Sequence, residues 1–517
     1  YNTPTSIGYG RSGGGAVGRT IYADNPQRIQ LYLQCMQGLG GPGKHTLHQL
    51  QSAIGGAAQS PSAGGADPDT IWSTAMEGDV VMPEERQAFP RGYFAQAVLN
   101  PPVEFYPVGK QFQKFTYPMP GKSEVHMIWG TSASYTGSHQ WGFGVQKAMQ
   151  SEKLECIVHQ TMWMEDGLVF SDIILPIATA PEAPDINTTR DIFNSITLRT
   201  EPVMAPIGEA RTDLAAVLEV AKALGWYDKL TGGKPYDEMM QERLKAAYAA
   251  SEITDLVSWE KLVEKGYFPQ TPDPKWYDRE PAYKKFYDDP VANPLKTPTG
   301  LLEIESSLLK ENFPDDKERP PVAHYVIGGP EADGWTHDED LTSERAKTYP
   351  LVIVSDTSTW KHHSMFSDVP WTREIEKITA WDGYAYAPVW ISPKDADERG
   401  IQDGDIVKVF NERGAVLGGA VISQRIIPGA LRFEKAGGGH HIIAGELHRG
   451  GNPNCINPKS SFSRNVYGLA CTHFLVQIEK VTGAQMQEWR ESYPEAFARD
   501  YDPAYGPFFT GWIEGAA

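Results

Sequence analysis

Histidine side chains gather in the C-terminal third of the sequence, and an imidazole ring can ligate a metal ion or hold an anion. Six of the 13 histidines lie there, namely His362, His363, His440, His441, His448 and His473. No spacing among them resembles a standard zinc motif, and adjacent histidines rarely ligate one ion together. Two interpretations therefore stay open for this region, a metal site and the recognition of an anionic ligand.

A long polar loop, Arg449 to Asn465, carries a second set of residues suited to ligand binding. It contains Asn452, Asn454 and Asn465, with glycines among them. Asparagine amides offer both a donor and an acceptor, and glycine lets a ligand approach the backbone closely. Asparagine also caps turns without any ligand, so the pattern fits either role.

Three apolar segments in the first half of the chain are expected to form parallel strands. They are Glu124–Trp129, Leu154–Val158 and Asp172–Pro176. A helix expected over about residues 138–150 joins the first two strands, and a further helix leads to the third, so the unit is βαβ. Ligands of such sheets bind beyond the carboxyl ends of the strands, which places Gly130–Thr136 and His159–Asp166 at a crevice. Ordinary strand-to-helix loops have the same composition, so a purely structural role stays open as well.

The region from Tyr349 to Val481 consists of short apolar segments separated by turn residues. Pro393 and Asp395 suit the first turn of a short helix, and Gly400 can end that helix. The expected strands are Tyr349–Val354, Ile406–Phe410, Ala415–Gln424, Ala430–Phe433 and Thr472–Glu479. Short strands with turn chemistry between them indicate a small, closed β-barrel.

The remaining segments are expected to be helical or irregular. Residues 60–120 are rich in proline and glycine and predict an irregular connection, whereas Lys310–Pro321 predicts a charged linker. Helices are expected at Asn25–Gln37, Thr212–Leu224, Tyr236–Ser251 and Ser258–Gly266.

The bulk composition excludes several classes of protein. A chain of 517 residues is expected to form about two to four domains. Its net charge of -19 argues against nucleic acid or an anionic membrane as the main partner. No apolar run has membrane-spanning length, and no Gly-x-Gly-x-x-Gly follows a strand as a nicotinamide enzyme would require. The sequence starts at Tyr1 in mid-pattern, so we expect its natural N-terminus to lie upstream.

The four cysteines also carry information about the class of protein. They are Cys35, Cys156, Cys455 and Cys471. They lie far apart and include no Cys-x-x-Cys pair, which excludes a disulfide framework, a zinc site and an iron–sulfur site built from these residues.

Residues of the barrel region and of the third strand match one known family. The matching barrel residues are Pro393, Asp395, Ala396, Gly400, Gly404, Asp405, Val407, Asn411, Gly414, Pro428 and Gly429. Ser171–Pro176, with Glu182 downstream, resembles the family's Ala-Asp-Ile/Val-x-Leu-Pro…Glu signature. Thr297–Ile304 resembles its Thr-Pro-Ser-Gly-Lys-Ile-Glu turn, with Leu301 at the lysine position. The sequence thus resembles the molybdopterin oxidoreductases, the dimethyl sulfoxide reductase superfamily.

The resemblance implies an α/β fold, with a parallel-sheet βαβ domain plus a C-terminal six-stranded double-psi-type β-barrel. The implied domains are a helix and Gly/Pro-rich connecting region at 1–120, the βαβ cofactor-binding domain at 121–200, a helical or mixed region at 201–330, the molybdopterin dinucleotide-binding barrel at 345–485, and a C-terminal extension at 486–517.

The resemblance also implies a molybdenum or tungsten bis-molybdopterin guanine dinucleotide cofactor, held by loops of the sheet and of the barrel. The candidates for cofactor binding are Gly130, Thr131, Ser132, Ser134, His159, Gln160, Ser355, Thr357, Trp360, His362, His363, Ser364, His440, His441, Asn452, Asn454 and Asn465. Asp172 and Pro176 are expected to be structural. The metal ligand and the iron–sulfur cysteines of the family lie N-terminal to the matching region, so no metal ligand and no catalytic residue is assigned.

The function implied by the resemblance is that of the catalytic large subunit of a molybdopterin-dependent oxidoreductase or transhydroxylase. The Gly450–Asn454 stretch is similar to the anaerobic phenol-processing branch, which includes pyrogallol–phloroglucinol transhydroxylase and the catechol dehydroxylases. Hydroxylated aromatic compounds are therefore the expected substrates. A reductase of oxyanions or sulfur compounds, and a scaffold subunit without cofactor, are the alternatives.

The resemblance carries further expectations for partners and compartment. A ferredoxin-like iron–sulfur subunit is the expected partner, with no nucleic acid and no direct membrane insertion. The cytoplasm is the expected compartment, and the periplasm is the alternative if a twin-arginine signal lies upstream.

Overall fold

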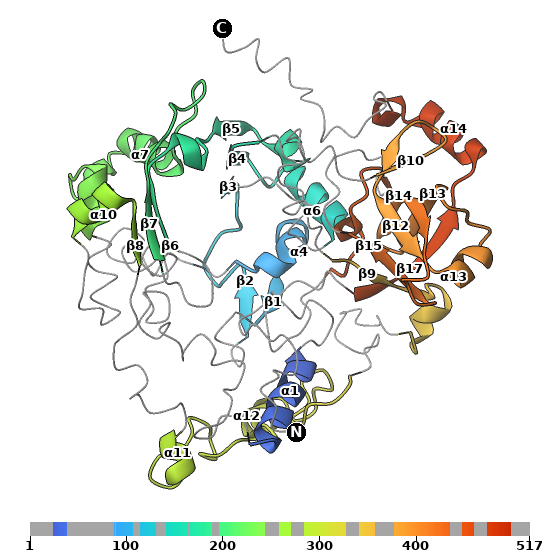
Figure 1. The fold of residues 1–517 in the computed structure, drawn as a ribbon, viewed down its shortest axis with the longest axis horizontal. Coiled ribbons are helices and arrows are strands. Elements are labelled where there is room, and N and C mark those ends of the chain that lie inside the picture. The colour runs from blue at the N-terminus through green and yellow to red at the C-terminus, as the bar shows by residue number, and fades with distance from the viewer. Residues whose placement is uncertain are drawn as a thin grey trace.

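The structure is a computed structural model of the 517-residue chain. It describes residues 24–38, 87, 89–106, 114–130, 141–163, 166–188, 196–242, 258–269, 284–326, 341–356, 377–434, 447–459 and 473–497. Figure 1 shows the C-terminal barrel on one side, the parallel strands in the middle and a helical region on the other side. Within the described ranges, no helix combines the length and apolar content needed to cross a membrane.

A closed barrel of six strands forms the C-terminal domain, as the sequence predicts. Its strands are β9 (Leu351–Val354), β12 (Pro388–Ile391), β13 (Ile406–Asn411), β14 (Gly414–Ile422), β15 (Ala430–Phe433) and β17 (His473–Lys480). They pair in the order β12-β15-β9-β17-β13-β14, and a parallel pairing of β12 with β14 closes the ring. Three short strands flank it: β16 (Leu447–His448), which pairs with β14, and the hairpin of β10 (Ile378–Thr379) with β11 (Ala385–Tyr386).

Apolar side chains from all six strands fill the barrel. Ile353, Val389, Val409 and Phe433 are among the fully buried members of this core. The alternation of buried and half-buried residues along β13 follows from its pleat, because successive side chains point to opposite faces. The barrel therefore has a packed interior, and ligands must bind at its ends.

The short helix α13 (Pro393–Asp397) has Pro393 and Asp395 in its first turn, as expected. The Ser392 side chain accepts a hydrogen bond from the Asp395 backbone N–H at 3.1 Å. Asp395 does more than face a helix start, because its buried carboxylate also accepts from the Gly429 N–H at 2.8 Å. Gly400 ends this segment with a φ of 62°, in the left-handed region that glycine tolerates.

The expected βαβ unit is present in the middle of the chain. Strands β3 (Met127–Gly130), β4 (Cys156–Thr161) and β5 (Ile173–Pro176) are parallel and lie in that order. The crossover helix α6 (Gly142–Met149) covers one face of the sheet together with α4 (Phe94–Leu99). The further helix expected before the third strand is only the 3-10 segment η5 (Asp166–Phe170).

Two predictions of irregular structure were wrong. Within 60–120, the described residues 91–105 and 115–117 form η4 (Arg91–Tyr93), α4 and an antiparallel pair of β1 (Val103–Phe105) with β2 (Phe115–Tyr117). Buried aromatic rings such as Phe105 and Tyr117 give this pair of strands a core of its own despite the prolines.

The charged segment 310–321 is likewise not a solvated linker. Its first three residues belong to the short helix α12 (Ser307–Asn312). Arg319 is buried, and its guanidinium lies 4.0 Å from the Tyr106 ring centroid and 3.9 Å from the Phe313 ring centroid. Arg28 of helix α1 (Asp24–Met36) donates to the Pro320 and Pro321 carbonyl oxygens, which ties the segment to the N-terminal region.

The remaining elements form the helical side of the molecule. Strands β6 (Asp185–Thr188), β7 (Ile196–Thr200) and β8 (Tyr267–Pro269) make a small antiparallel sheet. Helices near it are α7 (Asp213–Ala223), α8 (Tyr227–Thr231) and α10 (Trp259–Lys265), and the helix expected at 236–251 is described over 236–242. Shorter or isolated segments are η6 (Ala180–Glu182), α11 (Lys284–Asp288), η8 (Glu344–Lys347), η10 (Pro453–Cys455), α14 (Gly483–Ser492) and η11 (Pro494–Phe497).

Candidate functional site

One end of the barrel, which we call the mouth, collects the segments that the sequence marks for binding. Strands β9 and β15 are parallel, and β17 runs antiparallel to β9, so β9 and β15 end where β17 begins. Strand β13 is antiparallel to β17 and therefore also ends at the mouth. Ser355 directly follows β9, and the turn at Asn411 directly follows β13.

Six of the predicted site residues lie in the described part of the chain. They are Gly130, His159, Gln160, Ser355, Asn452 and Asn454. The others lie outside the described residues, namely Thr131, Ser132, Ser134, Thr357, Trp360, His362, His363, Ser364, His440, His441 and Asn465.

A loop that we call the asparagine loop, residues 449–459, reaches the mouth after β16. Three of its asparagines are buried and two hydrogen bonds link them. The Asn452 Oδ1 accepts from the Asn454 N–H at 3.1 Å, and the Asn457 Nδ2 donates to the Asn454 Oδ1 at 3.3 Å. Asn457 was not predicted, although it lies three residues beyond Asn454 in the same loop. Asn454 thus helps to hold the loop together.

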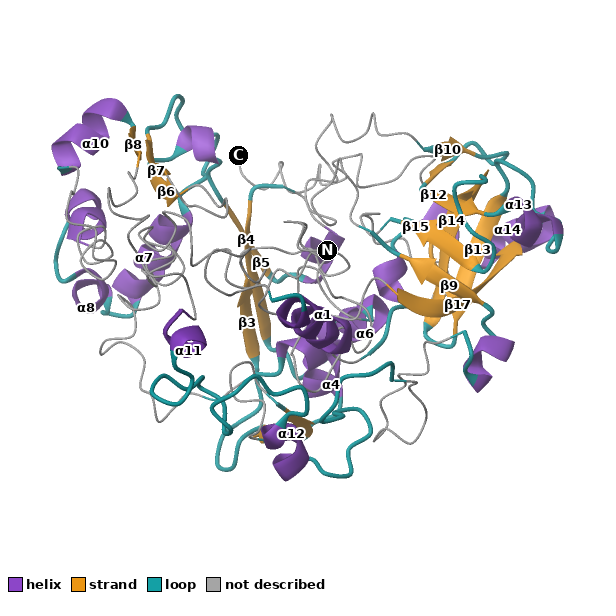
Figure 2. Cartoon of the chain, turned by 60° about the horizontal axis from the view of Figure 1, so that its bottom comes forward, coloured by secondary structure: helices purple, strands orange, loops and turns teal. Residues whose placement is uncertain are grey.

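The barrel meets the parallel-sheet domain at the asparagine loop and at α6, which lies between the parallel strands and the barrel in Figure 2. The Trp141 N–H, at the start of α6, donates to the Asn457 Oδ1. The Lys459 ammonium lies 4.1 Å from the Trp141 ring centroid. The Lys459 carbonyl oxygen accepts a hydrogen bond from the Gln96 side chain of α4. Phe143 of α6 is buried within the barrel core itself. The structure therefore brings together Trp141, at the start of α6, and the predicted binding loop of the barrel.

Trp141 adopts a conformation that non-glycine residues rarely take. Its φ is 47°, and its ring lies where a Cβ on Gly144 would approach it to 2.1 Å. Left-handed backbone at a bulky residue persists only when the surroundings enforce it. The hydrogen bond to Asn457 and the space left by Gly144 stabilise this conformation of Trp141.

Three polar atoms at the mouth are buried without a hydrogen-bond partner. They are the Ser355 Oγ, the Asp356 Oδ1 and the Asn452 Nδ2. Buried polar groups in native proteins are almost always hydrogen-bonded, so such atoms call for a partner from a ligand. Asp356 was missed by the sequence analysis; its other oxygen accepts from Arg432 at 3.0 Å. A carboxylate directly after a buried strand was the signal that could have identified it.

The residues at the carboxyl edge of the parallel sheet are held by neighbouring side chains. The His159 Nδ1 lies 2.7 Å from the Ser171 Oγ. The Gln160 Oε1 accepts from the Trp129 indole at 2.5 Å, and its Nε2 donates to the Asp213 carboxylate at 3.1 Å. Gly130 lies beside His159 in the strand register. A direct role of these three residues in ligand binding stays a prediction.

The expected structural role of Asp172 is visible. Its carboxylate accepts from the Ile157 N–H at 2.7 Å and so locks β5 onto β4. Glu182, the last residue of the signature, accepts from the Thr179 hydroxyl at 2.6 Å and from the Ile207 N–H at 2.8 Å. The hydrogen bonds from Thr179 and Ile207 hold the pKa of the Glu182 carboxyl below its usual value.

The pH dependence of stability offers a test of the His159 environment. Burial lowers the pKa of His159 in the folded protein, so the unfolded chain takes up a proton first as the pH falls. The stabilisation from the neutral imidazole is therefore present above about pH 6.5 and is lost as the pH falls through the lower folded pKa. We expect His159→Gln to lose less thermal stability than the wild type between about pH 7 and pH 5. Identical pH dependence of the two unfolding midpoints would contradict this environment.

Comparisons with known proteins match both halves of this arrangement. The model of the "Molybdopterin oxidoreductase" family matches residues 46–223, and that of the "Molydopterin dinucleotide binding domain" matches residues 351–463. A solved structure, acetylene hydratase from Pelobacter acetylenicus, has a similar fold, with a TM-score of 0.50 and 15% identity over 76% of this chain and 47% of its own.

Curated relatives cover most of the chain. Trimethylamine-N-oxide reductase of Haemophilus influenzae is 27% identical over 77% of the chain and 46% of its own length. Dimethyl sulfoxide/trimethylamine N-oxide reductase of Cereibacter sphaeroides is 27% identical over 86% of the chain and 51% of its own length. Pyrogallol hydroxytransferase large subunit of Pelobacter acidigallici is 26% identical over 93% of the chain and 60% of its own length. The chain thus spans about half the length of the curated relatives that it matches.

The two matched domains indicate a molybdenum bis-molybdopterin guanine dinucleotide cofactor. The residues at the mouth fit such a group, because pterin and guanine edges and phosphate oxygens can partner the unpaired atoms of Ser355, Asp356 and Asn452. The order of the two matched domains is also the order in which the sheet and the barrel occur here. The chain belongs to the molybdopterin oxidoreductases of the dimethyl sulfoxide reductase superfamily.

Proposed function

We propose that the chain is part of a catalytic large subunit that acts on hydroxylated aromatic compounds, by hydroxyl transfer or reductive dehydroxylation. The observation that carries this proposal is the extent of the similarity to the pyrogallol hydroxytransferase large subunit, which covers 93% of the chain. The N-oxide reductases quoted above are equally identical but cover 77% and 86%. The longer alignment supports the phenol-processing branch.

The residues of the mouth would hold the cofactor rather than perform the chemistry. When bound, the cofactor supplies redox or oxygen-atom transfer chemistry at its metal. The Asn452 amide would donate to an acceptor of the dinucleotide, and the Asp356 carboxylate would accept from an N–H of a pterin or guanine edge. The Ser355 hydroxyl can do either. The junction between α6 and the asparagine loop would exclude water from this side of the ligand, because Phe143, Cys455 and Asn457 are buried there.

Purified protein allows the cofactor class and the substrate class to be tested separately. We expect about one molybdenum or tungsten and about two pterin dinucleotides per chain. Under anaerobic conditions, activity with polyphenols should exceed activity with dimethyl sulfoxide, trimethylamine N-oxide and sulfur or arsenic oxyanions. Activity confined to the latter group would favour a reductase, which the similarity to the N-oxide reductases also supports. Metal and pterin both absent would favour a scaffold subunit.

Asn452→Asp tests the proposed cofactor contact with almost no change in shape. The substitution keeps the oxygen that caps the Asn454 N–H but replaces the unpaired donor with a carboxylate oxygen. A negative charge there repels an anionic dinucleotide, so we expect pterin content to fall about tenfold, as for supporting residues of metal sites. Asn312→Asp, which adds the same charge at the exposed end of α12, is the matched control. Equal pterin content in the two variants would remove Asn452 from the site.

We further propose an iron–sulfur partner of the ferredoxin type. The relative named as a large subunit supports the existence of a smaller companion. Isolation of the protein from its native source under anaerobic conditions should yield a second chain with bound iron and sulfide. A preparation of active protein without such a chain would contradict this partner.

A further inference from the structure

The turn that joins β13 to β14 reaches across to the asparagine loop. The Arg413 Nε donates to the Ile456 carbonyl oxygen at 2.8 Å, and the Asn411 Nδ2 donates to the same oxygen at 3.0 Å. Asn411 also donates to the Leu475 carbonyl oxygen at 3.2 Å, which anchors it to β17. We call Asn411 and Arg413 the clamp, because together they hold one carbonyl of the loop against the barrel.

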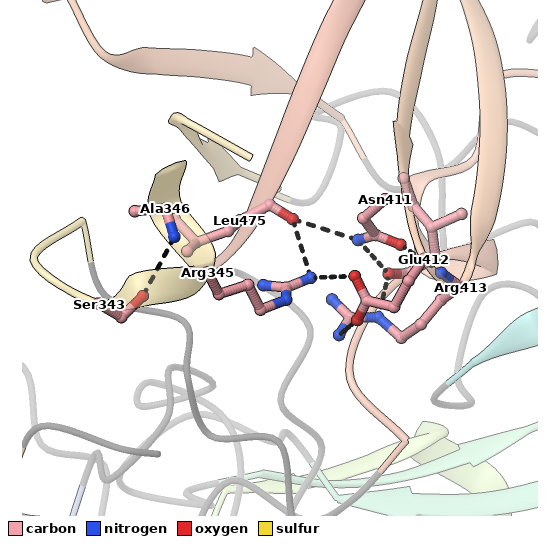
Figure 3. A network of polar contacts seen from close by, with 8 residues as sticks. Ser343, Arg345, Ala346, Asn411, Glu412, Arg413 and Leu475 are labelled. Carbon is pink, nitrogen blue, oxygen red and sulfur yellow. Dashed lines mark hydrogen bonds and ion pairs between the residues drawn. The ribbon is translucent and has the colours of Figure 1, made fainter. Parts of the chain in front are cut away.

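Figure 3 shows Asn411 and Arg413 in one network of polar contacts, and both residues are buried. The Asn411 Oδ1 accepts from the Arg413 N–H at 2.9 Å, so the two side chains fix the turn as well as the loop. The Arg413 side chain is only 2% exposed and pairs with the Glu412 carboxylate at 2.9 Å. A buried guanidinium is costly to desolvate unless ion pairs and hydrogen bonds satisfy it. Its position here is explained by the loop carbonyl that it reaches.

Glu412 connects the clamp to a second arginine outside it. Arg345 of η8 pairs with the other Glu412 oxygen at 2.7 Å, as Figure 3 shows. Burial alone would raise the pKa of Glu412, but the charges of Arg413 and Arg345 hold that pKa below its usual value. Both arginines therefore support the same carboxylate, and Arg413 is the one that donates to Ile456.

The hydrogen bonds to the Ile456 carbonyl also restrain the neighbouring residues, which we propose to lie next to the cofactor. One residue further along, the Asn457 Oδ1 accepts from the Trp141 N–H at the start of α6. Asn457 in turn donates to Asn454, whose backbone N–H is bound by Asn452. A short chain of hydrogen bonds thus runs from the clamp to the unpaired Asn452 amide and to the junction with the sheet domain.

We propose that Asn411 and Arg413 are positioning residues for the cofactor, which fix the asparagine loop so that Asn452 and the α6 junction are preorganised for the dinucleotide. This inference rests on the proposed cofactor site. It predicts that loosening the clamp weakens cofactor retention and mobilises the asparagine loop, without a matching effect on the rest of the barrel.

The test compares Arg413→Gln with Arg345→Gln in the purified, cofactor-loaded chain. Each variant removes one guanidinium from Glu412, but Arg413→Gln also releases Ile456. Two measurements are made: pterin retained after dilution, assayed as the oxidised fluorescent pterin, and amide hydrogen exchange of peptides covering 139–145, 450–458 and 406–410. Asn411→Ser, which weakens the hold without changing charge, is measured alongside in case the arginine variant does not fold.

We expect Arg413→Gln and Asn411→Ser to retain about tenfold less pterin than Arg345→Gln, the scale seen for residues that support metal sites. Exchange should accelerate in 450–458 and at Trp141 and stay as in the control in 406–410. A wild type that retains pterin, together with clamp variants that retain it as well as the control, would overturn the inference alone. A wild type without pterin would overturn the proposed function and this inference together.

Discussion

Phe143→Ala will destabilise the chain by about 3–5 kcal/mol, the usual cost of emptying a fully buried phenylalanine site. Phe143 belongs to α6 in the sheet domain, yet its ring is buried in the barrel core among side chains such as Val389 and Phe433. The substitution therefore opens a cavity beside the barrel core and removes an apolar contact between the two domains. Denaturant unfolding followed by tryptophan fluorescence measures the loss.

Phe143→Leu is the matched control for this cavity. Leucine keeps most of the apolar volume, so the loss should stay below about 1.5 kcal/mol. We also expect Phe143→Ala to make the 141–145 segment more sensitive to proteolysis, because it removes one of the side chains that join α6 to the barrel. Equal unfolding midpoints for the alanine and leucine variants would show that the ring is not packed as described.

Asp382→Ala is expected to lower the free energy of unfolding by a similar amount, about 3–5 kcal/mol, because it leaves the buried Arg449 guanidinium without this carboxylate partner. The Asp382 side chain is 1% exposed and lies 3.5 Å from the guanidinium of Arg449, which is 2% exposed. The same carboxylate accepts from the Tyr386 hydroxyl at 2.8 Å and lies 3.5 Å from Arg490 of α14. Arg449 starts the asparagine loop, so its partner Asp382 supports the start of that loop.

The control for Asp382 is an ion pair at the surface. Glu104 and Lys114 approach to 2.9 Å, but their side chains are 60% and 51% exposed. Glu104→Ala should therefore cost less than about 1 kcal/mol, since water screens exposed pairs. Thermal unfolding compares the two variants directly. Asp382→Ala with a midpoint as high as that of Glu104→Ala would refute the buried network.

The parts of the fold that were predictable from sequence are those set by local chemistry. Five of the six barrel strands, α13 with Pro393 and Asp395 in its first turn, and the three parallel strands follow from short apolar segments and turn residues. Strand β12 and the Ser392 cap were not predicted. The pair of β1 and β2 was missed, because proline and glycine around it hide the aromatic residues that form its core. Arg319 was missed for a similar reason, since a charged stretch gives no sign that aromatic rings will enclose it.

The site was predictable as a set of loops and less so as individual residues. The asparagine loop follows from residue types that suit hydrogen bonding, whereas Ser355, directly after β9, follows only from the family resemblance. Asp356, Asn457 and the clamp were missed because their roles depend on partners far away in sequence, such as Arg432, Trp141 and Ile456. Such long-range pairings are set by tertiary packing, which residue spacing does not report.

The burial of Phe143 inside the barrel has a consequence for synthesis on the ribosome. The first barrel strand begins at Leu351, 351 − 143 = 208 residues after the ring that completes its core. At ordinary elongation speeds of 5–20 residues per second, that separation corresponds to roughly 10–40 s of translation. During this interval Phe143 lacks the barrel side chains that bury it, so the barrel docks onto α6 only after the sheet domain has been made.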